Sequence, residues 1–287
     1  MEQIIDKITR MQQAEITEYK IYMKLADRID DKENAKILRS IAEDELKHYN
    51  FWNERTNTNI KAQKWKVYYY YFISIIFGIT FGIKLMEKGE EQAQEKYKEI
   101  VYQIEGAEKI LDEEDDHEKK LLNMLQEDRL NYIGSIVLGL NDALVELTGS
   151  LAGWSFALRN TRLIALTGLI MGIAASLSMA ASEYLSKKTA QEHHYALTSS
   201  LYTGGAYIIT VILLILPYLL LESYLLALIF TISLAILIIL IFNFYISVAK
   251  DLNFRERFFE MAGISIGVAV LSFIIGILVR TFLGIDI

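Results

Sequence analysis

Long apolar runs dominate residues 131–287 of the chain. Five of these runs are long enough to cross a membrane as helices, because about 20 helical residues span the ~30 Å hydrocarbon core of a bilayer. None of them alternates polar and apolar positions as a membrane-spanning strand would. We therefore predict a five-helix transmembrane domain, with spans near 132–158, 163–185, 199–221, 223–248 and 261–282.

The preceding 130 residues show the three- and four-residue apolar spacing of amphipathic helices instead. Gly106 and two polar loops interrupt this spacing, and four helices with short connections favour a four-helix bundle. The predicted fold class is therefore all-α, with a helical bundle in residues 1–130 followed by the membrane domain in 131–287. The predicted bundle helices are 2–29, 33–55, 87–105 and 107–130.

Residues 67–86 are apolar enough to form a sixth span. Spanning would place residues 1–60 and 87–130 on opposite sides of the membrane and would separate the acidic motifs described below. Four consecutive tyrosines favour an interface, where the ring is buried and the hydroxyl stays hydrated. We therefore expect this segment to begin the third bundle helix and to lie against the membrane surface or a partner subunit.

Charge divides the chain at the same place. Residues 1–130 contain 21 of the 29 Lys and Arg residues and 27 of the 36 Asp and Glu residues, so the remainder is nearly uncharged. An acidic front domain argues against nucleic-acid binding. The chain has no cysteine, which excludes disulfides and thiolate metal sites. The first thirty residues lack the apolar core of a signal peptide.

Basic residues in the short loops predict the orientation of the spans. The side that carries the front domain has five of them: Lys187, Lys188, Lys250, Arg255 and Arg257. The opposite side has three: Arg159, Arg162 and Arg280. The bias predicts a cytosolic N-terminal domain and an external C-terminus, which agrees with an odd number of spans. We expect the membrane to be a prokaryotic plasma membrane.

Two Glu-x-x-His motifs stand out in the front domain, at Glu45–His48 and Glu114–His117. A spacing of three residues places both ligands on one side of a helix, and a di-metal bundle needs two such motifs plus a glutamate from each of two other helices. Glu15 is the candidate on the first helix, with Glu18 as an additional ligand. Glu90 is the candidate on the third helix, and Glu87 and Glu91 are its neighbouring competitors. The alternative is that these residues form solvated acidic faces.

The ordered set Glu15, Tyr22, Glu45-x-x-His48 followed by Glu90, Tyr97, Glu114-x-x-His117 resembles the ferritin-like rubrerythrin family, without its rubredoxin-like part. The resemblance covers about 130 residues and is carried by those motifs. It implies a di-iron site (Fe²⁺/Fe³⁺), for which Mn²⁺ and Zn²⁺ are alternatives, together with ferroxidase or peroxide chemistry.

The predicted spans contain carboxylates, which are costly in lipid and usually mark a transport path. Asp142 lies near the middle of the first span, with Glu146 one turn further on. Glu183 lies near the cytosolic end of the second span, with Met179 one turn deeper. A carboxylate with a thioether suits Fe²⁺ better than Na⁺ or Mg²⁺. Apolar packing of Met179 and exposure of Glu183 at the interface are the alternatives.

The runs from Leu138 to Glu146 and from Ser178 to Ser186, with Pro217 in the third span, resemble the vacuolar iron transporter family. The resemblance implies a homodimer of five-span chains that exchanges cytosolic Fe²⁺, or Mn²⁺, for protons. The complete chain is similar to prokaryotic fusions of a ferritin-like domain with this membrane domain. Eukaryotic members of the family have a helical metal-binding insert between the second and third spans, whereas this connection has only about a dozen residues here.

These observations predict an exporter of ferrous iron whose front domain binds or oxidises the metal. The alternative is a membrane-anchored di-iron oxidase or peroxide scavenger, in which the spans serve only as an anchor. Manganese export is the third hypothesis. The sequence gives no preference between Fe²⁺ and Mn²⁺, and the role of the front domain in oxidation, storage or sensing stays open.

Overall fold

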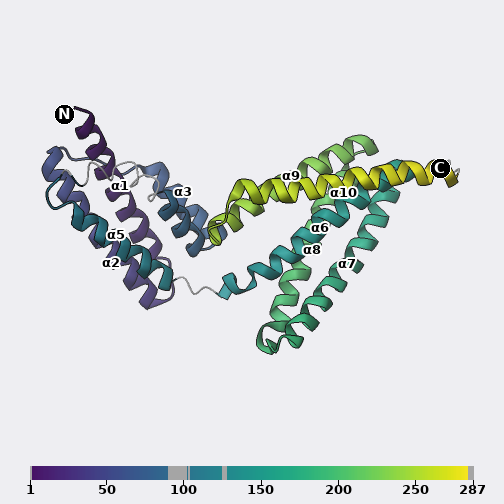
Figure 1. Cartoon of the computed structure of the whole chain (residues 1–287), viewed down its shortest axis with the longest axis horizontal. Coiled ribbons are helices and arrows are strands. Elements are labelled where there is room, and N and C mark those ends of the chain that lie inside the picture. Colours follow the sequence, from purple (N-terminus) through teal and green to yellow (C-terminus); the bar gives the residue numbers. More distant parts are fainter. Residues whose placement is uncertain (1, 90–101, 103, 125–127, 284–287) are drawn as a thin grey trace. The chain divides into compact units, whose positions relative to one another are not determined.

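The computed structural model describes residues 2–89, 102, 104–124 and 128–283. These residues form helices joined by turns and contain no strand, so the prediction of an all-α protein is confirmed. The chain divides into two compact units, Met1–Glu127 and Asp128–Ile287, whose helices are labelled in Figure 1.

The first unit is built on a hairpin of two long helices, α1 (Glu2–Ala26) and α2 (Lys32–Thr56). Asp31 begins α2, because its side chain accepts hydrogen bonds from the backbone N–H groups of Glu33 and Asn34. Asn57 ends the helix in the left-handed conformation, with φ of 50°. α5 (Glu108–Met124) packs on α2, and α3 (Lys64–Phe77) packs on α1.

The apolar segment 67–86 is not one continuous helix. α3 ends at Phe77, Gly78 has a φ of 99°, and residues 79–89 form a separate helical segment. Glycine adopts this positive φ without the steric penalty that a side chain would bring. At 14 residues, α3 is too short to cross a bilayer.

Two apolar clusters form the core of the first unit. The larger cluster joins α1, α2, α3 and α5 through buried side chains that include Tyr22, Leu38, Val67 and Leu121. The smaller cluster surrounds the fully buried Trp52. The two clusters therefore hold α1, α2 and α5 together around the Glu-x-x-His motifs.

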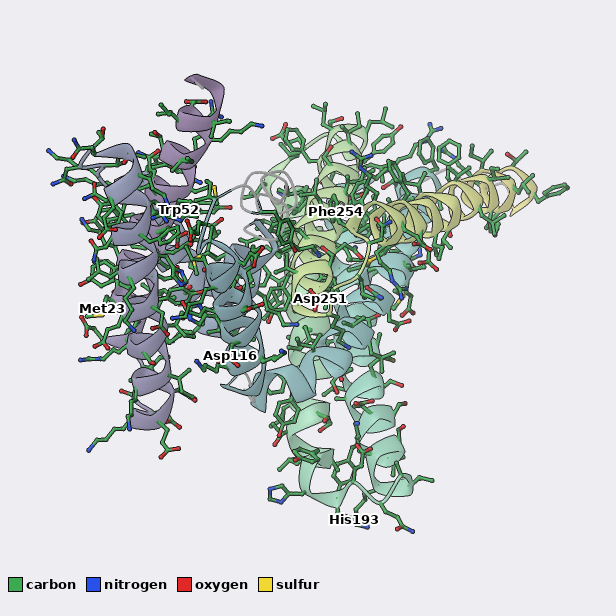
Figure 2. The ribbon with its side chains drawn as sticks, turned by 60° about the vertical axis from the view of Figure 1, so that its left-hand side comes forward. Met23, Trp52, Asp116, His193, Asp251 and Phe254 are labelled. Carbon is green, nitrogen blue, oxygen red and sulfur yellow. The ribbon has the colours of Figure 1, made fainter. Side chains whose placement is uncertain are left out.

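The second unit contains five helices that are long and apolar enough to cross a membrane, which confirms the predicted number among the described residues. They are α6 (Asp128–Leu158), α7 (Thr161–Thr189), α8 (His193–Leu220), α9 (Tyr224–Ala249) and α10 (Phe254–Leu283). Figure 2 labels His193, where α8 begins, and Asp251 and Phe254, at the connection between α9 and α10.

α6 is the central helix of the second unit and packs against α7, α8, α9 and α10. Two glycines permit its closest contacts: a Cβ at Gly139 would lie 2.2 Å from the carbonyl oxygen of Thr203, and a Cβ at Gly276 would lie 2.4 Å from that of Gly153. Helices in lipid associate through such small residues. Large apolar side chains such as Leu177, Leu220 and Phe282 are exposed on the outside, as expected for a surface that faces lipid.

Candidate metal centre and membrane carboxylates

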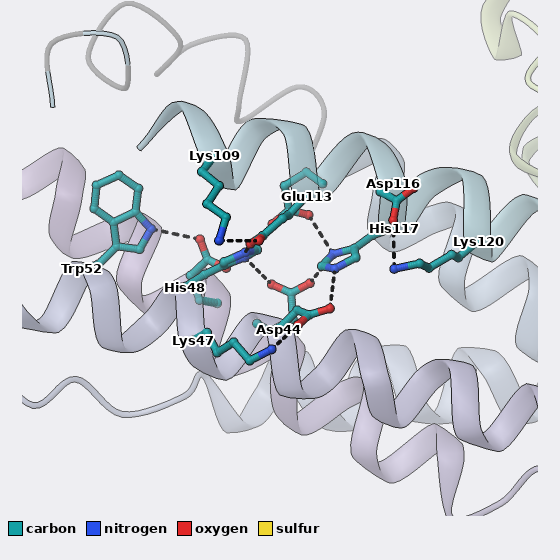
Figure 3. Close-up of polar contacts among 12 residues, drawn as sticks. Asp44, Lys47, His48, Trp52, Lys109, Glu113, Asp116, His117 and Lys120 are labelled. Atoms are coloured by element: carbon teal, nitrogen blue, oxygen red, sulfur yellow. Dashed lines mark hydrogen bonds and ion pairs between the residues drawn. The ribbon is translucent and has the colours of Figure 1, made fainter. Parts of the chain in front are cut away.

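The two Glu-x-x-His motifs of the first unit meet across α2 and α5. Glu45 directs one carboxylate oxygen to each imidazole: its Oε1 lies 3.2 Å from Nδ1 of His117, and its Oε2 lies 3.6 Å from Nδ1 of His48. Glu114 does the same, at 3.0 Å from His48 and 3.5 Å from His117. Each of the two glutamates therefore contacts both imidazoles, and His48 and His117 are labelled in Figure 3.

Glu15 of α1 completes the side of the cluster that contains His48. Its Oε2 lies 3.5 Å from His48 Nδ1, and its Oε1 accepts a hydrogen bond of 3.1 Å from the indole of the buried Trp52. Ligand atoms from four residues lie within 4.8 Å of one another, which is close enough to hold a metal ion; they belong to Glu15, Glu45, His48 and Glu114. In the described part of the chain this is the one such group of three or more acids or histidines.

Several polar atoms that point into this cluster are buried without a hydrogen-bond partner among the described residues. They are Oε2 of Glu15, Oε2 of Glu45, Nδ1 of His48 and Nδ1 of His117. Buried polar atoms are nearly always paired, so converging unpaired atoms need a partner. A divalent cation is the partner that carboxylate oxygens and imidazole nitrogens share, and the donor set fits iron, manganese or zinc.

The far side of each imidazole is held by a carboxylate from the opposite helix. His48 Nε2 lies 2.9 Å from Glu113 Oε2, and His117 Nε2 lies 3.2 Å from Asp44 Oδ2. A carboxylate accepts hydrogen bonds, so both Nε2 atoms carry the proton, and each Nδ1 faces the cluster. Lys47 in turn donates to Asp44, and Lys109 pairs with Glu113.

Glu18 and Glu87 lie at the edge of the same cluster. The Tyr22 hydroxyl donates a hydrogen bond to Glu87, which lies on the helical segment 79–89. The pKa of Glu87 is raised to about 7, chiefly by burial; nearby Glu114 and Glu45 also raise this pKa, and the hydrogen bond from Tyr22 lowers it. Burial likewise raises the pKa of Glu18 well above its ordinary value, with added repulsion from Glu45 and Glu15.

The pKa values of the two histidines and of Glu45 are shifted in opposite directions. Burial alone would lower the pKa of His117, but contacts with Glu114 and Glu45 raise it to about 10. The pKa of His48 is raised in the same way, by Glu114, Glu15 and Glu45. Burial would raise the pKa of Glu45, but both histidines outweigh it and lower the pKa to about 2.

The structure brings together five of the six predicted ligands: Glu15, Glu45, His48, Glu114 and His117. The sixth, Glu90, and its competitor Glu91 lie outside the described residues, as does Tyr97. Glu87 is the acid from this segment whose position is described, and it faces the cluster through Tyr22.

Asp142 and Glu146 lie one turn apart on α6 in the second unit, as predicted from their spacing. Asp142 is half-buried, whereas Glu146 is exposed on the side of the helix. The hydroxyl of Tyr207, a fully buried residue of α8, donates a hydrogen bond of 2.7 Å to Glu146 Oε2. Tyr207 thus fixes the direction of a carboxylate that lies within a membrane-spanning helix.

Glu183 is held separately from this pair. It is buried, and its Oε1 accepts a hydrogen bond of 2.7 Å from the Ser135 hydroxyl on α6. Met179, one turn away on α7, is half-buried and packs against the apolar core of the unit. Within a single copy of the chain, no described contact joins Glu183 to Asp142 or Glu146.

Sequence reasoning missed several partners of the predicted site residues, among them Asp44, Glu113, Ser135 and Tyr207. Asp44 and Glu113 each directly precede the glutamate of a Glu-x-x-His motif, so the repeated acid-Glu-x-x-His pattern was a usable signal. The roles of Ser135 and Tyr207 could not be predicted from the sequence, because serine and tyrosine occur in membrane-spanning helices for many other reasons. The contacts of all four depend on how the helices pack.

The fold and these two sets of carboxylates define an all-helical integral membrane protein whose first unit has a buried cluster of metal-ligand type. A model of the VIT family matches residues 133–199, which extend from α6 through α7 into α8. This match lies in the membrane-spanning region and implies a membrane transporter of iron or manganese. A search of curated proteins found no match.

Proposed function

We propose that this chain exports ferrous iron from the cytosol across a prokaryotic plasma membrane in exchange for protons, with Mn²⁺ as an alternative cargo. The VIT family match over residues 133–199 supports the transport of metal. The observation that carries the proposal is the position of Asp142 and Glu146 on one side of a spanning helix. Carboxylates at this depth are tolerated where they meet a cation, a proton or water.

The proposed ion path uses Asp142, Glu146, Met179 and Glu183. Glu183 receives the cation near the cytosolic end of α7, and Met179 offers a thioether that favours a transition metal over Mg²⁺. Asp142 binds the cation deeper in the membrane and exchanges a proton for it. The bond from Tyr207 leaves Glu146 Oε1 available to the same cation.

We propose that two copies of the chain form the working unit. The exposed side of Glu146 supports this, because a carboxylate that faced lipid would cost roughly 3 kcal/mol or more. A second copy that packed along this side of α6 would exclude lipid from Asp142 and Glu146. The same contact would bring two pairs of acids together around the path of the cation.

For the first unit we propose a ferritin-like di-metal centre. The residues that would hold the metals are Glu15, Glu45, His48, Glu114 and His117, with a glutamate from the segment containing Glu87, Glu90 and Glu91. The unpaired buried atoms of this cluster support the assignment. A bound pair of iron ions would supply electron transfer to oxygen or peroxide, and the chain's own residues hold the two positions and exclude bulk water.

The proposal is tested by metal flux in proteoliposomes that contain the full-length protein. Fe²⁺ and Mn²⁺ are compared under an imposed pH gradient, with an entrapped fluorescent chelator for the metal and an entrapped pH dye for the protons. We expect metal movement that depends on the gradient and is accompanied by opposite proton movement. Absence of flux for both metals would contradict the proposal.

A membrane-anchored oxidase is the second candidate, and the compact di-metal cluster of the first unit is the observation that favours it. The same preparation distinguishes the two functions. Consumption of oxygen or hydrogen peroxide without metal flux would favour the oxidase, whereas flux that persists after loss of the cluster histidines would favour the transporter.

Topology is tested with single cysteines, since the native chain has none. Ser40 lies on α2, and Glu222 lies between α8 and α9; both are exposed. With a cytosolic N-terminus, a membrane-impermeant thiol reagent added outside cells labels Glu222→Cys and leaves Ser40→Cys unlabelled. The reverse pattern would overturn the proposed direction of transport.

A further inference from the structure

α3 has one buried and one exposed side. Val67 and Ser74, two turns apart, are buried, and Tyr70 and Tyr71 pack on the larger core cluster of the first unit. The other side carries apolar and aromatic side chains at helical spacing, and all of them are exposed: Trp65, Tyr68, Tyr69, Phe72, Ile75 and Ile76. Trp65 is 66% exposed, Phe72 55% and Ile76 68%.

This exposed surface of α3 combines large apolar groups with polar N–H and O–H groups at their tips. The indole N–H of Trp65 and the hydroxyls of Tyr68 and Tyr69 make no hydrogen bond within the described part of the chain. Contiguous apolar surface of this kind usually marks a contact with another molecule. Tryptophan and tyrosine are enriched where a bilayer meets water, because the ring enters the apolar layer while the N–H or O–H reaches water and headgroups.

The charge of this segment differs from that of the unit around it. Residues 60–86 contain four lysines (Lys61, Lys64, Lys66 and Lys84) and no aspartate or glutamate, although residues 1–130 have an excess of acids. Lys64 and Lys66 flank Trp65 at the start of α3. Cationic residues beside an aromatic and apolar helical face are typical of helices that lie on an anionic membrane surface.

We propose that α3 docks the first unit onto anionic phospholipids of the membrane that the same chain spans. The five spans keep the unit close to the bilayer, so docking is an intramolecular step with a high effective concentration. A second copy is the competing occupant. A symmetric contact through this surface would offer its lysines no acid of the segment to pair with, whereas anionic headgroups complement them.

The proposal rests on membrane insertion of the second unit and not on the transported ion. Docking through α3 holds the metal cluster of the first unit at the bilayer surface and restricts the directions it can face. Docking therefore gives residues 67–86, which belong to neither the metal cluster nor the proposed ion path, a role in positioning the first unit.

The test uses spin labels on the full-length protein in nanodiscs. Phe72→Cys and Ile76→Cys carry the label on α3, and Ser40→Cys on α2 is the exposed control. In discs that contain phosphatidylglycerol, we expect labels at 72 and 76 to be accessible to dissolved oxygen and protected from a water-soluble nickel complex. The label at 40 should show the opposite behaviour. Equal nickel accessibility at all three positions would overturn the proposal.

The lysines test which lipid is recognised. Lys64→Gln with Lys66→Gln should lower the ratio of docked to undocked spectra by about 30-fold, because each lysine near an anionic surface contributes roughly a factor of five. The matched control replaces two exposed lysines of α1 and α2, as Lys20→Gln with Lys36→Gln. This control should change the ratio of docked to undocked spectra little. Neutral phosphatidylcholine discs should reproduce the effect of the α3 variant.

Two results would overturn the assignment in different ways. Protection that is unchanged in the Lys64/Lys66 variant and in neutral discs would exclude anionic headgroups. Protection from both oxygen and nickel, with dipolar broadening between labels on two copies, would assign the surface to a second copy. A failure of metal transport would leave all of these readouts intact, so it can be distinguished from a failure of docking.

Discussion

The two units hold their carboxylates in opposite ways. In the first unit, Glu45 and Glu114 share two histidines, and acids from α1 and from residues 79–89 surround them. In the second unit, Glu146 and Glu183 each have one neutral donor, Tyr207 and Ser135, from a neighbouring helix. The first arrangement contains its own compensating cations, whereas no described ion pair joins Glu146 or Glu183 to a cationic side chain.

The number and charge of the partners indicate what each site is suited to. A cluster with several ligands within hydrogen-bonding distance binds a metal through many contacts, and release requires all of them to be broken together. A carboxylate with one neutral partner binds a passing cation through few contacts and can exchange it for a proton. The first unit is suited to retention of metal, and the second to its movement.

The largest expected effect is on transport. Asp142→Asn keeps the shape of the side chain but removes its charge and its exchangeable proton, so Fe²⁺ flux in proteoliposomes should fall to that of protein-free vesicles. The metal content of the first unit should stay unchanged. Glu222→Gln, an exposed acid between α8 and α9, is the control and should transport normally. Wild-type flux in Asp142→Asn would break the comparison and favour the anchored oxidase.

Loss of both cluster histidines should remove metal from the first unit. His48→Ala with His117→Ala deletes the Nδ1 atoms that face Glu45 and Glu114, so elemental analysis of the full-length protein should lose about two Fe²⁺ per chain. The control removes the two remaining histidines, His193 and His194, which are exposed. Circular dichroism checks that both variants stay helical, and unchanged metal content in the cluster variant would contradict the assignment.

The acids behind the histidines should have a smaller effect. Asp44→Asn with Glu113→Gln weakens the bonds that orient both imidazoles, and such outer partners typically contribute about 10- to 100-fold to metal affinity. Competition with a fluorescent chelator measures the change. Glu43→Gln with Asp112→Asn is the matched control, because each residue is exposed and directly precedes one of the pair. Equal metal affinity in this variant and in its control would show that Asp44 and Glu113 form surface ion pairs without an effect on metal binding.

Metal affinity of the first unit should rise with pH. Burial raises the pKa of Glu87 to about 7, and contact with glutamates raises that of His117 to about 10, so both hold a proton at pH 6. A metal must displace these protons, and each one displaced strengthens binding by about tenfold per pH unit. The part of the rise in metal affinity that comes from deprotonation of Glu87 should level off above pH 7. Calorimetry in buffers of different ionisation enthalpy counts the protons, and a flat profile would contradict this view.

The smallest expected effect concerns the thioether of the ion path. Met179→Leu conserves most of the packing and removes only the sulfur, so Fe²⁺ flux should fall by less than about tenfold, while any flux of Mn²⁺, a harder cation, falls less. Met171 packs against the same apolar core, so Met171→Leu is the control. An equal effect of the two substitutions would assign Met179 to packing alone.

The sequence determined the helices and their environment. Apolar runs of more than 20 residues require five membrane helices, and observed helices such as α8 and α10 differ from the predicted spans mainly by continuing past the apolar part. The glutamate and histidine of each Glu-x-x-His motif share a side of their helix because three residues are nearly one turn. These features depend on neighbours in the chain, so periodicity is sufficient to find them.

Tertiary structure decided the partners. Glu45 and Glu114 each contact both histidines only because α2 and α5 pack against each other, and Asp44 and Glu113 reach the histidine of the opposite helix for the same reason. Ser135 reaches Glu183 over 48 positions of sequence, and Tyr207 reaches Glu146 over 61. Local periodicity contains no information on such contacts, because they are set by how apolar faces of distant helices pack together.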